Sequence, residues 1–413
     1  MSSVLVLVSG TVLAQLFTYL LSPVISRLYD PAEMSYLSLF SRIVTFLAVI
    51  ATARFELAFP LPKRDEHAFS LYRLSVQITI IMTLASVLVV LGLNAVEWED
   101  PNYYFLLALV PLGMLILALN SQGQTWAIRT KDFRSISVSK VLMSLTNSLS
   151  TIGLAFLNLG FKGVLIGYIV GLFSGTVLFI KSFVIAKRSN TKFKLKGRKY
   201  AIAKFYSDFP MINLPHVLVD LSKELFIAFY LIYTFEKDVL GLYDFSYRML
   251  RLPVSLIGVS ISQVFFNKAA DLVNNGVSIY PLVRKTFLTL LALSIVPFAV
   301  LFFFGGDLFA LVFGEPWRRA GEYSEIMAPW LMVNFLVSPL SQIPIILNKQ
   351  RAFFLLSLIG TGLLILSLTL GHLFPSLELT FKDILTVVSA GQFFFLIFVT
   401  GWVIWLTRKY SHD

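Results

Sequence analysis

The chain has 413 residues, of which 57% are hydrophobic and 14% are charged, and its mean hydropathy is +0.79. Soluble domains carry about 25% charged residues, so the composition excludes a soluble globular protein and indicates a polytopic membrane protein. The formal net charge of +11 does not by itself indicate a nucleic-acid partner, because Lys and Arg gather in the inner loops of membrane proteins, and the absence of cysteine excludes disulfides and thiolate metal sites.

Long apolar runs recur along the whole chain, and each is long enough to cross about 30 Å of hydrocarbon. Only helices satisfy the backbone over such runs in lipid, so we predict an all-α integral membrane protein. The first run is expected to be a retained span and not a signal peptide. The twelve expected spans are 4–25, 35–60, 75–93, 104–120, 140–157, 164–185, 209–233, 239–265, 287–304, 324–347, 353–370 and 384–407.

The distribution of positive charge predicts the orientation of these spans. An even number of spans places both termini on the same side of the membrane. The connections expected on that side hold most of the Lys and Arg outside the spans, above all the hydrophilic segment 186–205. By the positive-inside rule, both termini are therefore expected in the cytoplasm.

The same hydrophilic segment divides the chain into two similar halves. EMSYLSLFSRI, which begins at Glu33, matches VLGLYDFSYRM, which begins at Val239, at an offset of 206 residues. With six spans in each half, the halves have the same orientation and form a parallel repeat, which typically encloses a central cavity. The expected organisation is an N-terminal six-helix lobe, a basic linker and a C-terminal six-helix lobe at 1–190, 191–205 and 206–413.

Several cations lie inside the expected spans, where charge is costly and often functional. Arg248 and Arg251 share a helix face, and the repeat pairs Arg248 with Arg42. Arginines turned toward a cavity suit a bidentate, multiply charged anion such as a diphosphate. Snorkelling to the membrane surface is the alternative for Arg42 and Arg54, and a structural ion pair is the alternative for Arg248.

The span 209–233 carries a polar patch at helical spacing, formed by Asp220, Lys223 and Glu224. One interpretation is a self-neutralising cluster that fixes the helix in the bundle. The other is that Lys223 contributes to an anion site while a carboxylate binds protons, because two carboxylates one turn apart raise each other's pKa. By contrast, the four-residue glycine spacing of GYIVGLFSG at 167–175 predicts close helix packing.

The sequence has no phosphate-binding loop, no D-x-D or H-E-x-x-H motif and no plausible metal-ligand cluster. Its outer connections are also short for an enzyme that polymerises membrane-linked sugars. We therefore expect a transporter without cofactor or metal, and not an enzyme.

Five strings along most of the chain resemble the Wzx-like polysaccharide-biosynthesis flippases of the multidrug/oligosaccharidyl-lipid/polysaccharide exporter superfamily. These include RLYDPAEMSYLSLF, RMLRLPVSLIG and FGEPWRRAGEY, of which the last two are the most specific. The resemblance implies two six-helix lobes, alternating access and a polyprenyl-diphosphate-linked oligosaccharide as cargo. It also implies that Arg27, Arg54 and Arg248 or Arg251 hold the diphosphate.

Together, these observations predict a lipid-linked oligosaccharide flippase of the bacterial inner membrane that serves O-antigen (lipopolysaccharide), capsule or exopolysaccharide synthesis. Its expected partners are the cargo lipid, membrane lipids, protons or sodium and glycan-polymerase machinery, and no nucleic acid. The rival functions are a cation-coupled drug or metabolite antiporter of the same fold and a membrane glycan polymerase. The expected cargo ligands are Arg27, Arg42, Arg54, Lys223, Arg248 and Arg251, and the expected ion-coupling residues are Glu56, Asp220 and Glu224.

Overall fold

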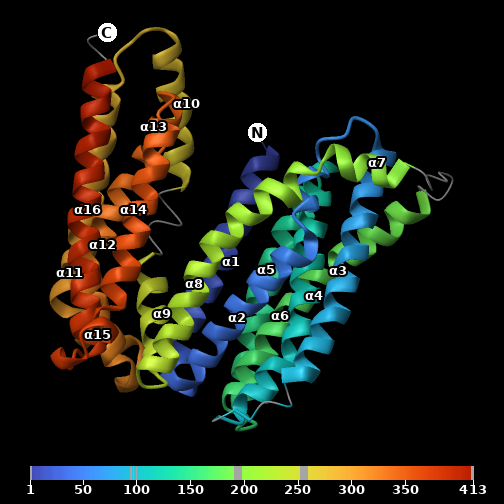
Figure 1. The fold of residues 1–413 in the computed structure, drawn as a ribbon, viewed down its shortest axis with the longest axis horizontal. Coiled ribbons are helices and arrows are strands. Elements are labelled where there is room, and N and C mark those ends of the chain that lie inside the picture. Colours follow the sequence, from blue (N-terminus) through green and yellow to red (C-terminus); the bar gives the residue numbers. More distant parts are fainter. Residues whose placement is uncertain are drawn as a thin grey trace. The chain divides into compact units, whose positions relative to one another are not determined.

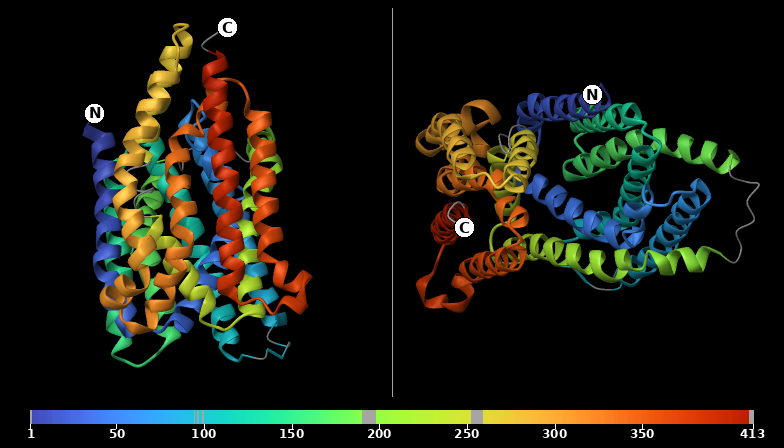
Figure 2. Two further views of the ribbon diagram at one scale, coloured as in Figure 1. Left: turned by 90° about the vertical axis from the view of Figure 1, so that its left-hand side faces the viewer. Right: turned by 90° about the horizontal axis from the view of Figure 1, so that it is seen from above.

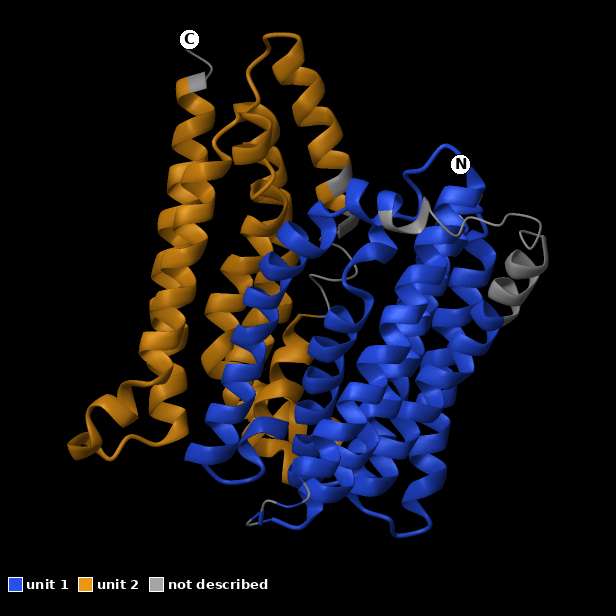
Figure 3. Cartoon of the chain, turned by 45° about the vertical axis from the view of Figure 1, so that its right-hand side comes forward, with its two compact units in different colours: residues 1–241 blue, residues 242–413 orange. Residues whose placement is uncertain are grey.

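The structure is a computed structural model that describes residues 2–93, 95, 97, 98, 100–189, 198–251 and 259–410. All regular elements among these residues are helices, which confirms the predicted all-α class (Figure 1). The chain forms two compact units, unit 1 at residues 1–241 and unit 2 at residues 242–413 (Figure 3).

Unit 1 holds the first eight α-helices and two short turns of other helix types. They are α1 (Ser2–Leu28), α2 (Pro31–Thr52), the 3₁₀ helix η1 (Phe55–Ala58), α3 (Asp65–Leu93), α4 (Asn102–Arg129), α5 (Phe133–Ala155), α6 (Phe161–Ser189), α7 (Arg198–Phe205), the π-helix η2 (Phe209–Asn213) and α8 (Leu214–Thr234). The next helix, α9 (Val239–Leu250), begins in unit 1 and continues into unit 2.

In its described residues, unit 2 continues with two short helices, two 3₁₀ turns and five longer helices. They are α10 (Val259–Asn274), α11 (Tyr280–Phe313), η4 (Glu315–Trp317), α12 (Arg318–Leu340), α13 (Ile343–Ile346), α14 (Gln350–Leu368), α15 (Leu370–Leu373), η5 (Pro375–Leu377) and α16 (Phe381–Tyr410).

Nine helical segments in the described part of the chain are long and apolar enough to cross a membrane, and each overlaps an expected span. The other three expected spans differ in character. The one at 140–157 falls on the Ser- and Thr-rich α5, and the one at 209–233 falls on η2 and the charged α8. The one at 239–265 corresponds to α9 and the start of α10, and its residues 252–258 lie outside the described residues.

Close helix packing in unit 1 is built on small residues. The helix α5 lies between α1 and α6 (Figure 2). A Cβ atom at Gly171 would come within 2.5 Å of the Asn147 side chain, and one at Gly175 within 2.3 Å of Met143. The predicted role of the 167–175 glycines in helix packing is therefore confirmed.

The helix α2 has a central place in unit 1. It packs against α4 on one side, while α8 lies along another (Figure 1). Pro31 starts the helix, and the Glu33 carboxylate accepts the backbone N–H of Asp30 at 2.9 Å, which caps the first turn. Because α2 and α8 pack together, charged residues of the two helices lie along the contact between them, which we call the α2–α8 seam.

Unit 2 is organised around the pair α11 and α12. The helix α11 has a kink at Phe304, which has non-helical φ and ψ angles. Just beyond it, Gly305 faces Gly321 of α12 so closely that a Cβ atom on Gly321 would lie 2.2 Å from the Gly305 carbonyl oxygen. Trp317 is fully buried at the adjoining turn, and α16 packs against α12 and α14.

The predicted linker at 191–205 is partly outside the described residues, since 190–197 are not described. Its second part forms α7, which packs against α3 in unit 1. The division into lobes at 1–190 and 206–413 stays a prediction from the sequence repeat. The compact units instead divide at residue 241, because α8 packs against α2.

Candidate functional site

The first group of charged residues lies on the α2–α8 seam of unit 1. Arg42 of α2 is 16% exposed, and its Nη2 lies 3.7 Å from Oε2 of Glu224 on α8, whose side chain is 41% exposed. This distance describes an ion pair without a short hydrogen bond. From the sequence, Arg42 was predicted to bind cargo and Glu224 to bind the coupling ion. In the structure, the two residues form an ion pair with each other.

Toward the end of α2, the backbone breaks sharply. The helix ends at Thr52, and Ala53 and Arg54 both adopt left-handed conformations with φ of 48° and 58°. Non-glycine residues in this region store about 1–3 kcal/mol each. The predicted continuous span 35–60 is therefore too long at this end, because its apolar sequence continues as the 3₁₀ turn Phe55–Ala58 instead of as α-helix.

The break aims the Arg54 side chain at two partners. Its Nε donates to Oδ1 of Asn213 at 2.9 Å, and its Nη1 lies 3.5 Å from Oε1 of Glu56. Asn213 is the last residue of the π-helix that precedes α8, an irregularity that is common at functional sites. Arg54 therefore links the end of α2 to the start of α8.

Glu56 is the most deeply buried of the expected site residues in the described part of the chain, with 2% exposure. It lies in a turn beside the aromatic cluster of Phe55, Phe59, Tyr72 and Trp126. Burial raises the pKa of this carboxyl above its usual value, although hydrogen bonds from Thr52 and the backbone and, to a smaller extent, the charge of Arg54 oppose that effect. Its Oε2 has no hydrogen-bond partner among the described residues, so this carboxyl is suited to hold a proton.

The other two members of the polar patch on α8 are Asp220 and Lys223. Asp220 is exposed and Lys223 is half-buried on the same helix. Glu224 turns to Arg42, so one member of the predicted patch is used across the helix seam. Arg27, in the last turn of α1, is exposed.

The second group lies at the end of α9 in unit 2, with Arg248 in the last turn of the helix and Arg251 directly after its last residue. The Arg248 guanidinium lies over the Phe245 ring at 5.4 Å, and that of Arg251 lies over the Tyr247 ring at 5.3 Å. Phe245 is itself held against Trp317 at 4.3 Å between ring centroids. Both arginines are exposed, and each guanidinium group is oriented by the aromatic ring that it lies over.

A buried cluster at the opposite end of α2 was not predicted from the sequence. Asp100 is 7% exposed and accepts hydrogen bonds from the Tyr36 hydroxyl and, at 2.9 Å, from Lys237 Nζ. Burial alone would raise the pKa of Asp100, but these hydrogen bonds lower it below its usual value. The only sequence signal was that two short outer connections carry charged residues.

A second residue not predicted from the sequence is Lys140, which stands at the start of the expected span 140–157. It belongs to α5, and its Nζ lies 3.0 Å from Thr11 Oγ1 of α1. It lines a cavity of about 330 Å³ in unit 1. The other polar side chains that line this cavity are those of Thr11, Gln15, Gln124, Ser144, Asn147 and Tyr168.

A protein-family model described as "Polysaccharide biosynthesis protein" matches residues 24–322. The chain belongs to this polysaccharide-biosynthesis family. A search of curated proteins finds no match. The family match covers both arginine groups described above and confirms the resemblance seen in the sequence.

Solved structures with a similar fold are transporters of the MOP superfamily. An inward-facing multidrug-resistance MATE transporter matches with a TM-score of 0.71 and 12% identity, over 96% of this chain and 95% of that one. The lipid II flippase MurJ in an inward closed conformation matches with 0.69 and 14%, over 97% and 89%. A MOP transporter from Pyrococcus furiosus, described by the reverse polarity of its binding pocket, matches with 0.56 and 13%, over 99% and 96%.

These similarities establish the fold, and the polysaccharide-biosynthesis protein is a multi-pass membrane protein with the architecture of MOP transporters. No group of three or more His, Cys, Asp or Glu side chains in the described part of the chain is arranged to hold a metal ion. The charged and aromatic groups described above include guanidinium groups, carboxylates paired with them, and aromatic rings.

Proposed function

We propose that this protein is a flippase that moves polyprenyl-diphosphate-linked oligosaccharides across the bacterial inner membrane, for O-antigen, capsule or exopolysaccharide synthesis. The observation that carries the proposal is membership of a polysaccharide-biosynthesis family by a chain with a MOP-transporter fold. The fold shared with a lipid II flippase adds support, because lipid II is also a lipid-linked sugar. A sugar head group cannot cross hydrocarbon unaided, so the reaction needs a protein but no covalent step.

The diphosphate is proposed to bind to arginines. Arg248 and Arg251 are the strongest candidates, because both are exposed and each is oriented by a ring below it. Planar guanidinium groups match phosphate oxygens in a bidentate geometry. Arg54, Arg27 and Lys223 are further candidates, and the ion pair with Glu224 makes Arg42 a structural residue at rest.

Coupling to protons or sodium is proposed to run through Glu56 more than through Asp220 or Glu224. Glu56 is buried beside Arg54, and the same arginine binds Asn213. Protonation would remove the negative charge that faces Arg54 and free the guanidinium to bind the diphosphate. This exchange of partners gives ion binding a direct effect on cargo affinity.

The proposed orientation places both termini in the cytoplasm, following the positive-inside rule. The cargo would then enter from the cytoplasmic leaflet and be released on the outer side, where glycan-polymerase machinery is the proposed recipient. The membrane potential adds about 2.3 kcal/mol per charge per 100 mV to any charged step.

The deciding experiment is reconstitution of the full chain in liposomes with a lipid-linked oligosaccharide in the inner leaflet. Protein-dependent appearance of the sugar at the outer surface, detected with a membrane-impermeant glycosidase, is the expected result. The double variant Arg248→Ala/Arg251→Ala should lower this rate at least about tenfold, since each lost charge-assisted contact contributes about 1.5–3 kcal/mol. The matched control Arg284→Ala/Arg351→Ala removes two exposed arginines of unit 2 outside the proposed site.

Two other results would replace the proposal with one of its rivals. Proton-driven export of cationic drugs, with no movement of the lipid-linked sugar, would indicate an antiporter. Growth of the sugar into chains by the purified protein would indicate a polymerase.

A further inference from the structure

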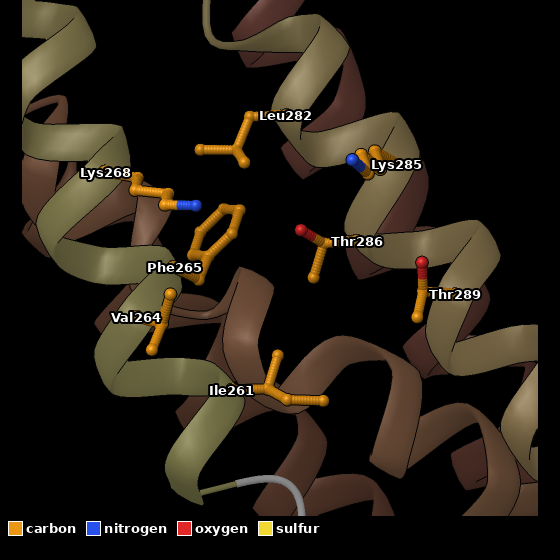
Figure 4. A pocket seen from close by; sticks show the side chains of 8 residues that line it. All are labelled: Ile261, Val264, Phe265, Lys268, Leu282, Lys285, Thr286 and Thr289. Atoms are coloured by element: carbon orange, nitrogen blue, oxygen red, sulfur yellow. The ribbon is translucent and has the colours of Figure 1, made fainter.

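Unit 2 contains a groove between α10 and α11, lined by side chains of both helices. Its volume is about 410 Å³. The helix α10 packs mainly against α12 and α13, which leaves its side toward α11 open. The lining residues, drawn in Figure 4, are Ile261, Val264, Phe265, Lys268, Leu282, Lys285, Thr286 and Thr289.

Both cations of the groove lie toward the same end. Lys268 of α10 extends its amine toward α11, where Lys285 and Thr286 lie across the groove (Figure 4). Val264 and Ile261 lie farther along α10, away from the lysines. The groove therefore has its two cations and Thr286 toward one end, where Leu282 also lies, and at the other end mostly hydrocarbon side chains with the hydroxyl of Thr289 across from them.

The two lysines lie near the ends of their helices that face the connection between α10 and α11. Lys268 is six residues before the end of α10 and Lys285 is five residues after the start of α11, so both are about 8–9 Å from their helix ends at 1.5 Å per residue. The two ends are joined by the short connection 275–279. Ile261 and Val264 lie farther from these helix ends, so in a membrane crossed by the candidate span α11 they would lie nearer the hydrocarbon than the lysines do.

We propose that this groove, the Lys268–Lys285 groove, binds an anionic phospholipid. Its phosphate lies between the two ammonium groups, its polar head meets Thr286, and one acyl chain lies along Val264, Phe265 and Ile261. A membrane-spanning segment is surrounded by lipid, so a phospholipid has access to the groove. Its phosphate is complementary in charge to the lysine end, and its acyl chain is complementary to the hydrocarbon side chains at the other end. In the orientation proposed above, the lipid comes from the cytoplasmic leaflet.

The groove is distinct in chemistry from the proposed cargo site. Lysines are point cations that suit a single phosphate, whereas the paired guanidiniums of Arg248 and Arg251 suit a diphosphate. A lipid seated between α10 and α11 would also supply packing that these two helices lack. It would thus stabilise α10, which follows the proposed cargo-binding helix α9 in the chain.

The test uses the purified full chain, depleted of lipid in detergent, and native mass spectrometry with added phosphatidylglycerol or phosphatidylcholine. The wild type should retain one phosphatidylglycerol molecule and little phosphatidylcholine. Lys268→Gln/Lys285→Gln should weaken this binding about 30-fold, because each lysine near an anionic lipid contributes about a factor of five. The control Arg284→Gln/Lys349→Gln, which also removes two exposed cations of unit 2, should bind as the wild type does.

A second variant tests the groove separately from its charge. Val264→Trp fills the apolar part and leaves both lysines in place, so it should also lose the bound lipid. Equal binding of the two lipids, or equal loss in the control variant, would overturn the proposal. Retention of polyprenyl phosphate in place of phosphatidylglycerol would overturn the choice of occupant, and none of these results depends on the flippase assay.

Discussion

Gly241 donates its backbone N–H to Oγ of Ser35 at 2.7 Å, and these two residues are 206 positions apart. That separation equals the offset between the two matching strings of the sequence, so Ser35 and Gly241 are equivalent positions in that match. Each lies in the first turns of its helix, α2 for Ser35 and α9 for Gly241. The hydrogen bond therefore joins the beginnings of two helices with similar sequences.

Replacing Gly241 tests how closely these helices must approach. A Cβ atom there would lie 2.0 Å from the Pro31 carbonyl oxygen, so Gly241→Ala must push α9 away from α2. We expect a loss of about 1–3 kcal/mol in the free energy of unfolding, as overpacking usually produces. Thermal unfolding in detergent measures it, with Gly362→Ala as the control because a Cβ atom there meets nothing within 4 Å. Equal stability of the two variants would contradict the close approach.

The Arg42–Glu224 ion pair is tested by charge exchange. If the pair is structural, Arg42→Glu should lower stability and transport, and Arg42→Glu/Glu224→Arg should restore both. The coupling energy is expected to be about 0.2–1 kcal/mol, because Glu224 is 41% exposed. A double-mutant cycle on unfolding midpoints gives this number. Transport that stays low in the exchanged variant would instead show that Arg42 binds cargo.

Glu56 should make stability fall as the pH rises. Its pKa is raised above the ordinary value of 4.5 by burial, so the folded state binds a proton more tightly than the unfolded state does. The resulting stabilisation is fully present below about pH 4.5 and is lost as the pH rises through the pKa of the folded state. Unfolding midpoints measured across this range should vary less in Glu56→Gln. Replacing the exposed Glu97 by Gln should leave the wild-type dependence intact.

Asp100 should have the opposite effect. Its pKa is lowered below 3.8 because the hydrogen bonds from Tyr36 and Lys237 outweigh burial. Its stabilisation is present above about pH 3.8 and is lost as the pH falls through the pKa of the folded state. At neutral pH, Asp100→Asn is expected to cost about 1–3 kcal/mol, since it removes the carboxylate charge that accepts hydrogen bonds from Lys237 and Tyr36. Unfolding midpoints equal to the wild type at pH 7 would disprove this role.

Hydropathy predicted most helices because the cost of exposing backbone groups in lipid acts on every residue of a span. Hydropathy did not predict features that depend on local backbone geometry or on contacts between helices. The apolar run through Phe55 gave no sign of the break after Thr52, since the left-handed residues there are neither Gly nor Asn. The Arg42–Glu224 and Arg54–Asn213 contacts were also unpredictable, because they depend on α8 packing against α2.

The last prediction concerns Lys140. Burying an ammonium group inside a helix bundle costs free energy, and charges at such positions usually have a function. Its amine donates a hydrogen bond to Thr11, and no carboxylate is among the residues that line its cavity in the described part of the chain. Lys140→Met keeps the length of the side chain and removes the charge, so we expect stability to rise by about 1 kcal/mol or more. Transport should fall at the same time if the charge serves the cycle, and Lys140→Arg should retain it. A variant with wild-type stability and transport would show that Lys140 merely extends to the membrane surface.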